Sequence, residues 1–108
     1  MDLTVLTIPG CPNAAVFGER LAAALEGYPS AVVHCRQVAD EQEAAETGMA
    51  GSPTLLINDT DPFATPGQAP ALSCRLYRDE AGRVARTPSV EDLRRALEQA
   101  RSMPAAAS

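Results

Sequence analysis

A strand–helix–strand pattern over the first 38 residues places the tightest constraint on how this chain can fold. Residues 3–8 (LTVLTI) alternate and contain β-branched side chains, which is typical of a short buried strand. Apolar residues then recur at helical spacing from Asn13 to Glu26, and residues 31–38 (AVVHCRQV) form a second strand-like run. Because a helix connects the two strands, we expect them to pair in parallel.

The rest of the chain predicts two further strands and two further helices. Asp40 is placed to cap a helix that ends at Gly48, and Ser89 is placed to cap the last helix. The expected elements are a helix over residues 40–48, strands over 54–58 and 73–78, and a helix over 90–101. The order βαβαββα predicts an α/β fold with a four-stranded mixed sheet and helices on both faces.

Length and charge restrict the classes of function. The 108 residues suit one domain, expected over residues 1–102, with a flexible tail at 103–108. A net charge of -5 argues against a nucleic-acid partner, because phosphate binding needs a basic surface. No apolar run approaches the roughly 20 residues of a membrane span, and the N-terminus lacks a secretory signal pattern. These features predict a cytoplasmic protein that does not bind membranes.

The segment Pro9-Gly10-Cys11-Pro12-Asn13 joins the first strand to the first helix. We expect the helix to start at Pro12, because the missing N–H of proline costs nothing at the first helical position. Cys11 would then face unpaired N–H groups and the positive end of the helix dipole, which favour the reactive thiolate. Three cysteines without a secretory signal suit a reactive thiol better than a disulfide scaffold. The alternative for Cys11 is a buried, unreactive side chain.

Three local features together resemble the thioredoxin-like superfamily over about residues 3–101. The segment Cys11-Pro12-Asn13-Ala14 occupies the place of the family's Cys-X-X-Cys motif. Residues 48–54 (GMAGSPT) look like its Gly-X-X-Gly-X-Pro-Thr stretch, and residues 90–97 look like its final helix. The order and spacing of the three features are what make the resemblance specific.

The resemblance also implies a substrate-binding site around the cysteine. The peptide bond before Pro53 is cis in the family, and it would turn the backbone of Ser52 toward Cys11. That backbone is expected to pair with an extended peptide or thiol substrate, as strand addition does elsewhere. The substrate-binding residues that we expect are Pro9, Gly10, Pro12, Asn13, Ser52, Pro53 and Thr54.

Ala14 departs from the family pattern, because it replaces the second cysteine that resolves the mixed disulfide formed at the first. A disulfide inside the motif is therefore excluded, and the sequence resembles single-thiol members such as monothiol glutaredoxins. Their usual Cys-Gly-Phe-Ser motif is also absent, so we expect neither an iron–sulfur centre nor another cofactor.

Cys74 has two interpretations. In a plain thioredoxin topology the fourth strand starts at the end of the sheet remote from Cys11, which makes Cys74 a core or edge residue. The loop at residues 59–72 is long enough to give the roughly 4.4–6.8 Å Cα separation of a disulfide, and Cys74 would then be a resolving thiol. Cys35 and His34 are expected to be structural. No metal site is predicted, because no paired cysteine or histidine spacing supports zinc.

The loop over residues 59–72 contains three prolines and Phe63, one of only four aromatic residues in the chain. Loops of this length in compact domains are often functional. An exposed Phe63 would contact a substrate or a second subunit. The alternative is a loop that folds back on its own core.

The main functional hypothesis is a single-thiol oxidoreductase or thiol-reactive protein. The Cys11 thiolate would attack a protein disulfide, a low-molecular-weight substrate or an electrophilic group, and a small thiol or Cys74 would resolve the adduct. One alternative is a non-catalytic module with this fold, used for binding or homodimerisation. Another is a mercury or organomercurial thiol protein, similar to alkylmercury lyase, that uses Cys11 and Cys74.

Overall fold

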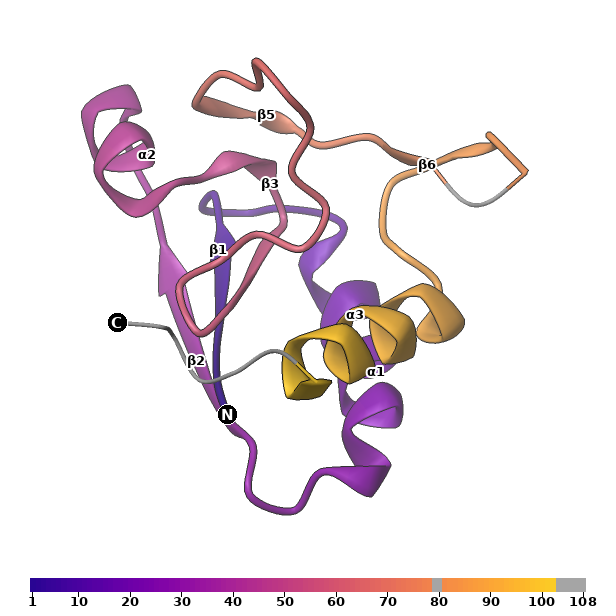
Figure 1. The fold of residues 1–108 in the computed structure, drawn as a ribbon. Helices are drawn as coiled ribbons and strands as arrows, with labels where there is room; N and C mark the ends of the chain where they lie inside the picture. Colours follow the sequence, from indigo (N-terminus) through magenta and orange to yellow (C-terminus); the bar gives the residue numbers. More distant parts are fainter. Residues whose placement is uncertain (79–80, 103–108) are drawn as a thin grey trace.

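The computed structural model describes residues 1–78 and 81–102 (Figure 1). It shows a mixed α/β fold, as the sequence predicts. The predicted tail at 103–108, and residues 79 and 80 of a predicted turn, lie outside the described residues. In chain order the elements are β1 (Asp2–Thr7), α1 (Ala14–Ala24), the 3-10 helix η1 (Leu25–Gly27), β2 (Val32–Gln37), α2 (Glu41–Thr47), β3 (Ala50–Ser52), β4 (Thr54–Ile57), β5 (Ala71–Cys74), β6 (Tyr77–Arg78), β7 (Val84–Ala85) and α3 (Val90–Ser102).

The central sheet has the strand order β2–β1–β4. β1 pairs in parallel with β2, with Val5 opposite Cys35, which confirms the pairing expected of a strand–helix–strand unit. β4 runs antiparallel to β1, with Leu3 opposite Ile57. β1 is therefore the middle strand, which explains why its side chains contribute to the core on both faces.

The side chains of β1 contribute to two apolar clusters, and α1 and α3 pack together at the larger one (Figure 1). Leu3 and Val5 belong to a large apolar cluster that also contains Phe17 of α1 and Leu97 of α3. Leu6 belongs to a smaller cluster with Ala44 of α2. The alternation of β1 thus divides the core between the faces, and each large apolar side chain that is fully buried stabilises the fold by roughly 1.5–3 kcal/mol.

The predicted fourth strand at residues 73–78 is divided between two small sheets in the described part of the chain. β5 pairs in parallel with β3, and β6 pairs antiparallel with β7. The break falls at Arg75, which is 6% exposed, and at Leu76, which is 63% exposed. These exposures are the reverse of what hydropathy predicts, and the contacts of the buried arginine, described below, account for the break.

Both predicted ends of α2 are confirmed. The Asp40 side chain accepts a hydrogen bond from the backbone N–H of Glu43 at 2.7 Å, and Gly48 ends the helix with a φ of 82°. Hydrogen bonds from Arg36 and from the N–H of Ala39 hold the pKa of the Glu43 carboxyl below its usual range. Local side-chain chemistry is therefore sufficient to place this helix.

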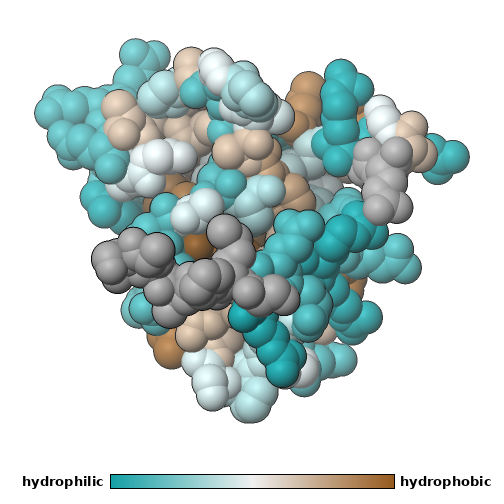
Figure 2. Space-filling view, in the orientation of Figure 1, coloured by the Kyte–Doolittle hydropathy of each residue, from teal (hydrophilic) through white to brown (hydrophobic). Residues whose placement is uncertain are grey.

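Hydrophilic residues gather over the exposed sides of α2 and α3, at the upper left and lower right of Figure 2. These sides carry the charged residues of the two helices, so solvation accounts for the acidic residues of α2. No helix among residues 1–78 and 81–102 has the length and apolar character needed to cross a membrane.

Candidate functional site

Cys11 lies partly exposed in the loop between β1 and α1. Its N–H donates to the Ile8 carbonyl at 3.2 Å, and its own carbonyl accepts from the Ala14 N–H at 3.3 Å. These bonds close two successive turns, so α1 begins at Ala14 with Asn13 as its N-cap. The prediction that the helix begins at Pro12 is wrong by two residues. Cys11 precedes the N-cap and does not lie in the first helical turn.

Asn13 does not cap the helix that it precedes. Its side chain makes no capping hydrogen bond, and its Nδ2 atom is buried without a partner among the described residues. An unsatisfied buried polar group costs about 1–3 kcal/mol. Asn13 is therefore a predicted substrate-binding residue whose side-chain donor is not used to hold the fold.

The substitution Asn13→Ala is expected to leave the free energy of unfolding unchanged or to raise it by up to about 1 kcal/mol, because no cap is lost and an unpaired donor is removed. Urea unfolding would measure the change. Asp40→Ala is the matched control, since it removes a working cap and should lose about 1 kcal/mol. A loss at Asn13 as large as the loss at Asp40 would contradict this interpretation.

The Ser52–Pro53 peptide bond is cis, as the resemblance implies. The Ser52 hydroxyl accepts a hydrogen bond from the Ile8 N–H at 3.1 Å, and both Ser52 and Pro53 are fully buried. The Ile8 carbonyl in turn accepts from Cys11. A short chain of hydrogen bonds therefore ties the loop that carries Cys11 to the end of β3.

The hydroxyl of Thr54, a predicted substrate-binding residue, makes hydrogen bonds within the same segment. The Thr54 hydroxyl donates to the Gly51 carbonyl at 2.6 Å and accepts from the Ala50 N–H at 3.2 Å. Its side chain is fully buried. Thr54 therefore shapes the turn at Pro53, and any role in substrate binding stays a prediction.

Cys74 lies on β5, opposite Ser52 in the parallel pairing with β3. Figure 1 shows β3 and β5 at the same end of the central sheet as the loop after β1. The long loop has thus returned the chain toward the segment that carries Cys11, and Cys74 is an exposed residue of an outer strand. All three cysteines are free thiols, so a disulfide between Cys11 and Cys74 stays a prediction.

His34 and Cys35 lie apart from this segment, on the exposed edge strand β2. Within the described ranges, no three histidine, cysteine, aspartate or glutamate residues are grouped in a way that could hold a metal ion. The structure therefore brings Ser52, Pro53 and Cys74 toward the Cys11 loop. His34 and Cys35 lie outside this group.

Arg75 is the residue that sequence reasoning missed. Its Nη1 atom lies 2.7 Å from Oδ2 of Asp61, in an ion pair whose side chains are only 5% and 9% exposed. Its Nη2 atom donates to the Phe63 carbonyl at 2.9 Å, and its guanidinium carbon lies 4.7 Å from the ring centroid of Tyr77. The loop between β4 and β5 therefore folds back around one buried cation.

Phe63 and Tyr77 complete this packing. Their ring centroids lie 5.3 Å apart in an edge-to-face arrangement, and Phe63 packs against the larger apolar cluster. The Tyr77 hydroxyl donates to the Pro53 carbonyl, and burial raises the pKa of Tyr77, so the hydroxyl keeps its proton. Of the two interpretations of Phe63, the structure shows the loop that folds back on the core.

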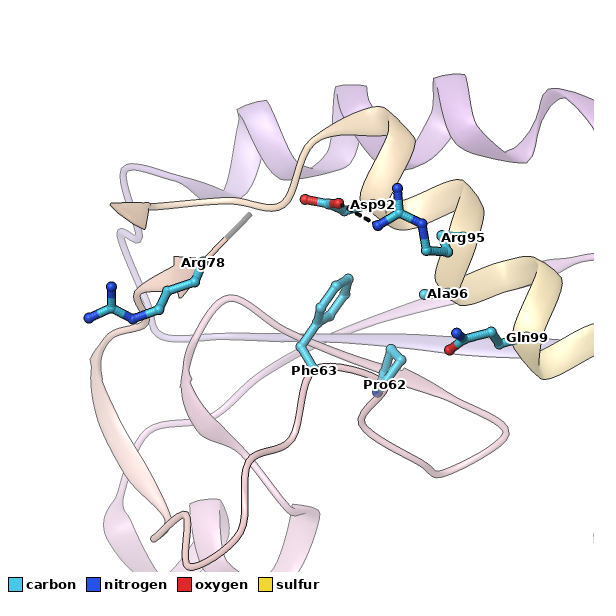
Figure 3. A pocket seen from close by; sticks show the side chains of 7 residues that line it. All are labelled: Pro62, Phe63, Arg78, Asp92, Arg95, Ala96 and Gln99. Carbon is cyan, nitrogen blue, oxygen red and sulfur yellow. Dashed lines mark hydrogen bonds and ion pairs between the residues drawn. The ribbon is translucent and has the colours of Figure 1, made fainter. Parts of the chain in front are cut away.

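A pocket of about 270 Å³ lies between this loop and α3 (Figure 3). Phe63 points into it from the loop, and the ion pair between Asp92 and Arg95, at 3.3 Å, stands on the helix side. The Arg78 side chain extends away from the cavity. The pocket is lined by none of the cysteines, so it is separate from the segment around Cys11.

Comparison with protein-family models, curated proteins and solved structures found no significant match to the chain. Its function is therefore inferred from the residues of the site itself.

Proposed function

We propose that the protein is a thiol-reactive oxidoreductase with a thioredoxin-like fold, in which Cys11 is the nucleophile and Cys74 the resolving thiol. The observation that carries the proposal is the meeting of three segments at Ser52. The Cys11 loop reaches Ser52 through Ile8, the cis bond to Pro53 follows it, and Cys74 lies opposite it on β5.

The order of the elements supports the fold assignment within this proposal. The parallel unit β1–α1–β2 is followed by α2 and by an antiparallel strand that begins immediately after the cis-proline. α3 then packs beside α1 on one face of the sheet. The segment that would complete a four-stranded sheet pairs instead with β3, and Arg75 makes the last hydrogen bond of that pairing.

The proposed reaction is thiol–disulfide exchange. The Cys11 thiolate attacks one sulfur of a disulfide, which forms a mixed disulfide and releases the other half as a thiolate that takes a proton from solvent. The Cys74 thiol then loses its proton and attacks Sγ of Cys11. This step forms a Cys11–Cys74 disulfide and releases the half of the substrate that was bound to Cys11. Two molecules of a low-molecular-weight thiol then reduce the Cys11–Cys74 disulfide and leave as their own disulfide.

The substitution Cys11→Ser is expected to abolish adduct formation with bis(2-hydroxyethyl) disulfide, because serine has no nucleophilic sulfur at that position. Cys74→Ser should keep the first step and accumulate the mixed disulfide at Cys11. Cys35→Ser is the matched control, since it removes an exposed free thiol on β2 and should leave the rate of adduct formation at Cys11 unchanged. Intact-mass measurements with peptide mapping would follow all three variants.

Two results would contradict the proposal. Equal adduct formation by the Cys11→Ser and unaltered proteins would assign the reactivity to another cysteine. An unaltered protein in which Cys11 forms no adduct would favour a non-catalytic module that has kept the fold without the chemistry.

A further inference from the structure

The carbonyl groups at the end of β3 are already paired within the chain. The Ser52 carbonyl accepts from the Arg75 N–H at 3.0 Å, the Gly51 carbonyl accepts from the Thr54 hydroxyl, and the Pro53 carbonyl accepts from the Tyr77 hydroxyl. An extended peptide binds to a sheet edge by pairing with free backbone groups. Three consecutive carbonyls are thus not free to receive one.

β5 and β3 also lie in direct contact, without space for a peptide between them. Gly51 has a φ of +103°, and a Cβ atom at that position would lie 2.8 Å from Cβ and 3.1 Å from Cα of Arg75. Ala71 donates its N–H to the Met49 carbonyl at 3.1 Å, at the other end of the pair. β5 therefore occupies the position beside β3 that a strand-like substrate would take.

The buried ion pair holds β5 in this position. Arg75 ends the pairing with β3 and also binds Asp61 and the Phe63 carbonyl in the preceding loop. Moving β5 away from β3 would break the hydrogen bonds from Arg75 to the Ser52 carbonyl and to the Thr54 hydroxyl, and it would disturb the buried pair with Asp61. These contacts together keep the edge of β3 closed.

The approach to the two thiols is open by contrast. Pro9, Gly10 and Pro12 are exposed around the partly exposed Cys11, and Cys74 is exposed on β5. A small molecule can reach these groups from solvent without pairing with β3.

We propose that β5 serves as a built-in strand that closes the edge of β3, and that the site therefore acts on small disulfides of low-molecular-weight thiols and excludes extended polypeptides. The inference rests on the proposed function, because it names the substrate class of Cys11. It changes the expectation from sequence that the Ser52 backbone would pair with a peptide substrate.

The test compares two disulfides that share one chemical group. One is bis(2-hydroxyethyl) disulfide, and the other carries a hydroxyethylthio group on the central cysteine of a short extended peptide. For each disulfide, the rate of Cys11 modification is divided by the rate at which the same disulfide reacts with N-acetylcysteine in solution. We expect the normalised rate for the small disulfide to be at least about tenfold higher, since the peptide cannot add to the closed edge.

A variant tests the role of the ion pair, and amide exchange gives a readout that does not depend on Cys11. Asp61→Asn weakens the ion pair with little change of shape, and it should move the ratio toward unity. Glu43→Gln, which weakens the surface pair with Arg36, is the matched control and should leave the ratio unchanged. Amide hydrogen exchange in the unaltered protein should be as slow at Arg75 as within β1.

The outcomes separate the two proposals. Equal normalised rates for both disulfides, or fast exchange at Arg75, would overturn the closed edge and leave the reactivity of Cys11 standing. No adduct at Cys11 with either disulfide would overturn the proposed function, and the substrate class with it.

Discussion

Replacing Arg75 with methionine is expected to lower the free energy of unfolding by about 3–5 kcal/mol, because the Asp61 carboxylate stays buried without its partner. Methionine keeps much of the volume of the arginine stem, so the loss reports on charge and hydrogen bonding more than on a cavity. The bonds to Thr54 and to the Phe63 carbonyl are removed as well. The loop that they hold carries Phe63 onto the core.

Urea unfolding would measure this loss against a matched surface pair. Arg36 forms an ion pair with Glu43 at the same 2.7 Å distance, but the side chains are 54% and 27% exposed. Arg36→Met should therefore change stability by less than about 1 kcal/mol. Adding Asp61→Asn to Arg75→Met removes the buried charge and should recover part of the loss. A loss at Arg75 no larger than that at Arg36 would show that the loop is not held by this pair.

Local sequence patterns predict the elements in the first half of the fold and the position of Pro53 in the candidate site. The alternation of β1, the helical spacing after Asn13 and the cap at Asp40 each depend on neighbouring residues, and the structure contains all three elements. The position of Pro53 also follows from a short motif. The start of α1 differs because two hydrogen-bonded turns around Cys11 delay it, and such turns leave little trace in apolar spacing.

The second half of the fold depends on contacts between residues far apart in the sequence. The alternation of apolar and polar residues along one segment does not predict such contacts. Residues 73–78 have the pattern of one continuous strand, yet the pairing of Arg75 with Asp61 divides them. The pairing of β3 with β5 also has an irregular register between Ala50 and Ser52. An arginine inside an alternating segment, with an aspartate in the proline-rich loop before it, is the sequence signal that could have indicated this ion pair.

The substitution Gly51→Ala is expected to lower the free energy of unfolding by about 2–4 kcal/mol, since it combines a left-handed backbone position with an overlap against a packed strand. The added Cβ would lie 2.8 Å from Cβ of Arg75 and 3.2 Å from the Ser73 carbonyl oxygen. Both neighbours belong to the segment that β3 pairs with, so neither can move without separating the strands.

Gly67→Ala is the matched control for backbone strain. Gly67 has a φ of +76°, but an added Cβ would have no neighbour within 4 Å. Its loss should be limited to the roughly 1–2 kcal/mol of a left-handed residue. The difference between the two variants in urea unfolding then measures how closely β5 is packed on β3, and amide exchange at Arg75 should rise only in Gly51→Ala. Equal losses at the two glycines would mean that the strands can part to accommodate a methyl group, and the edge beside Ser52 would then be open to a peptide.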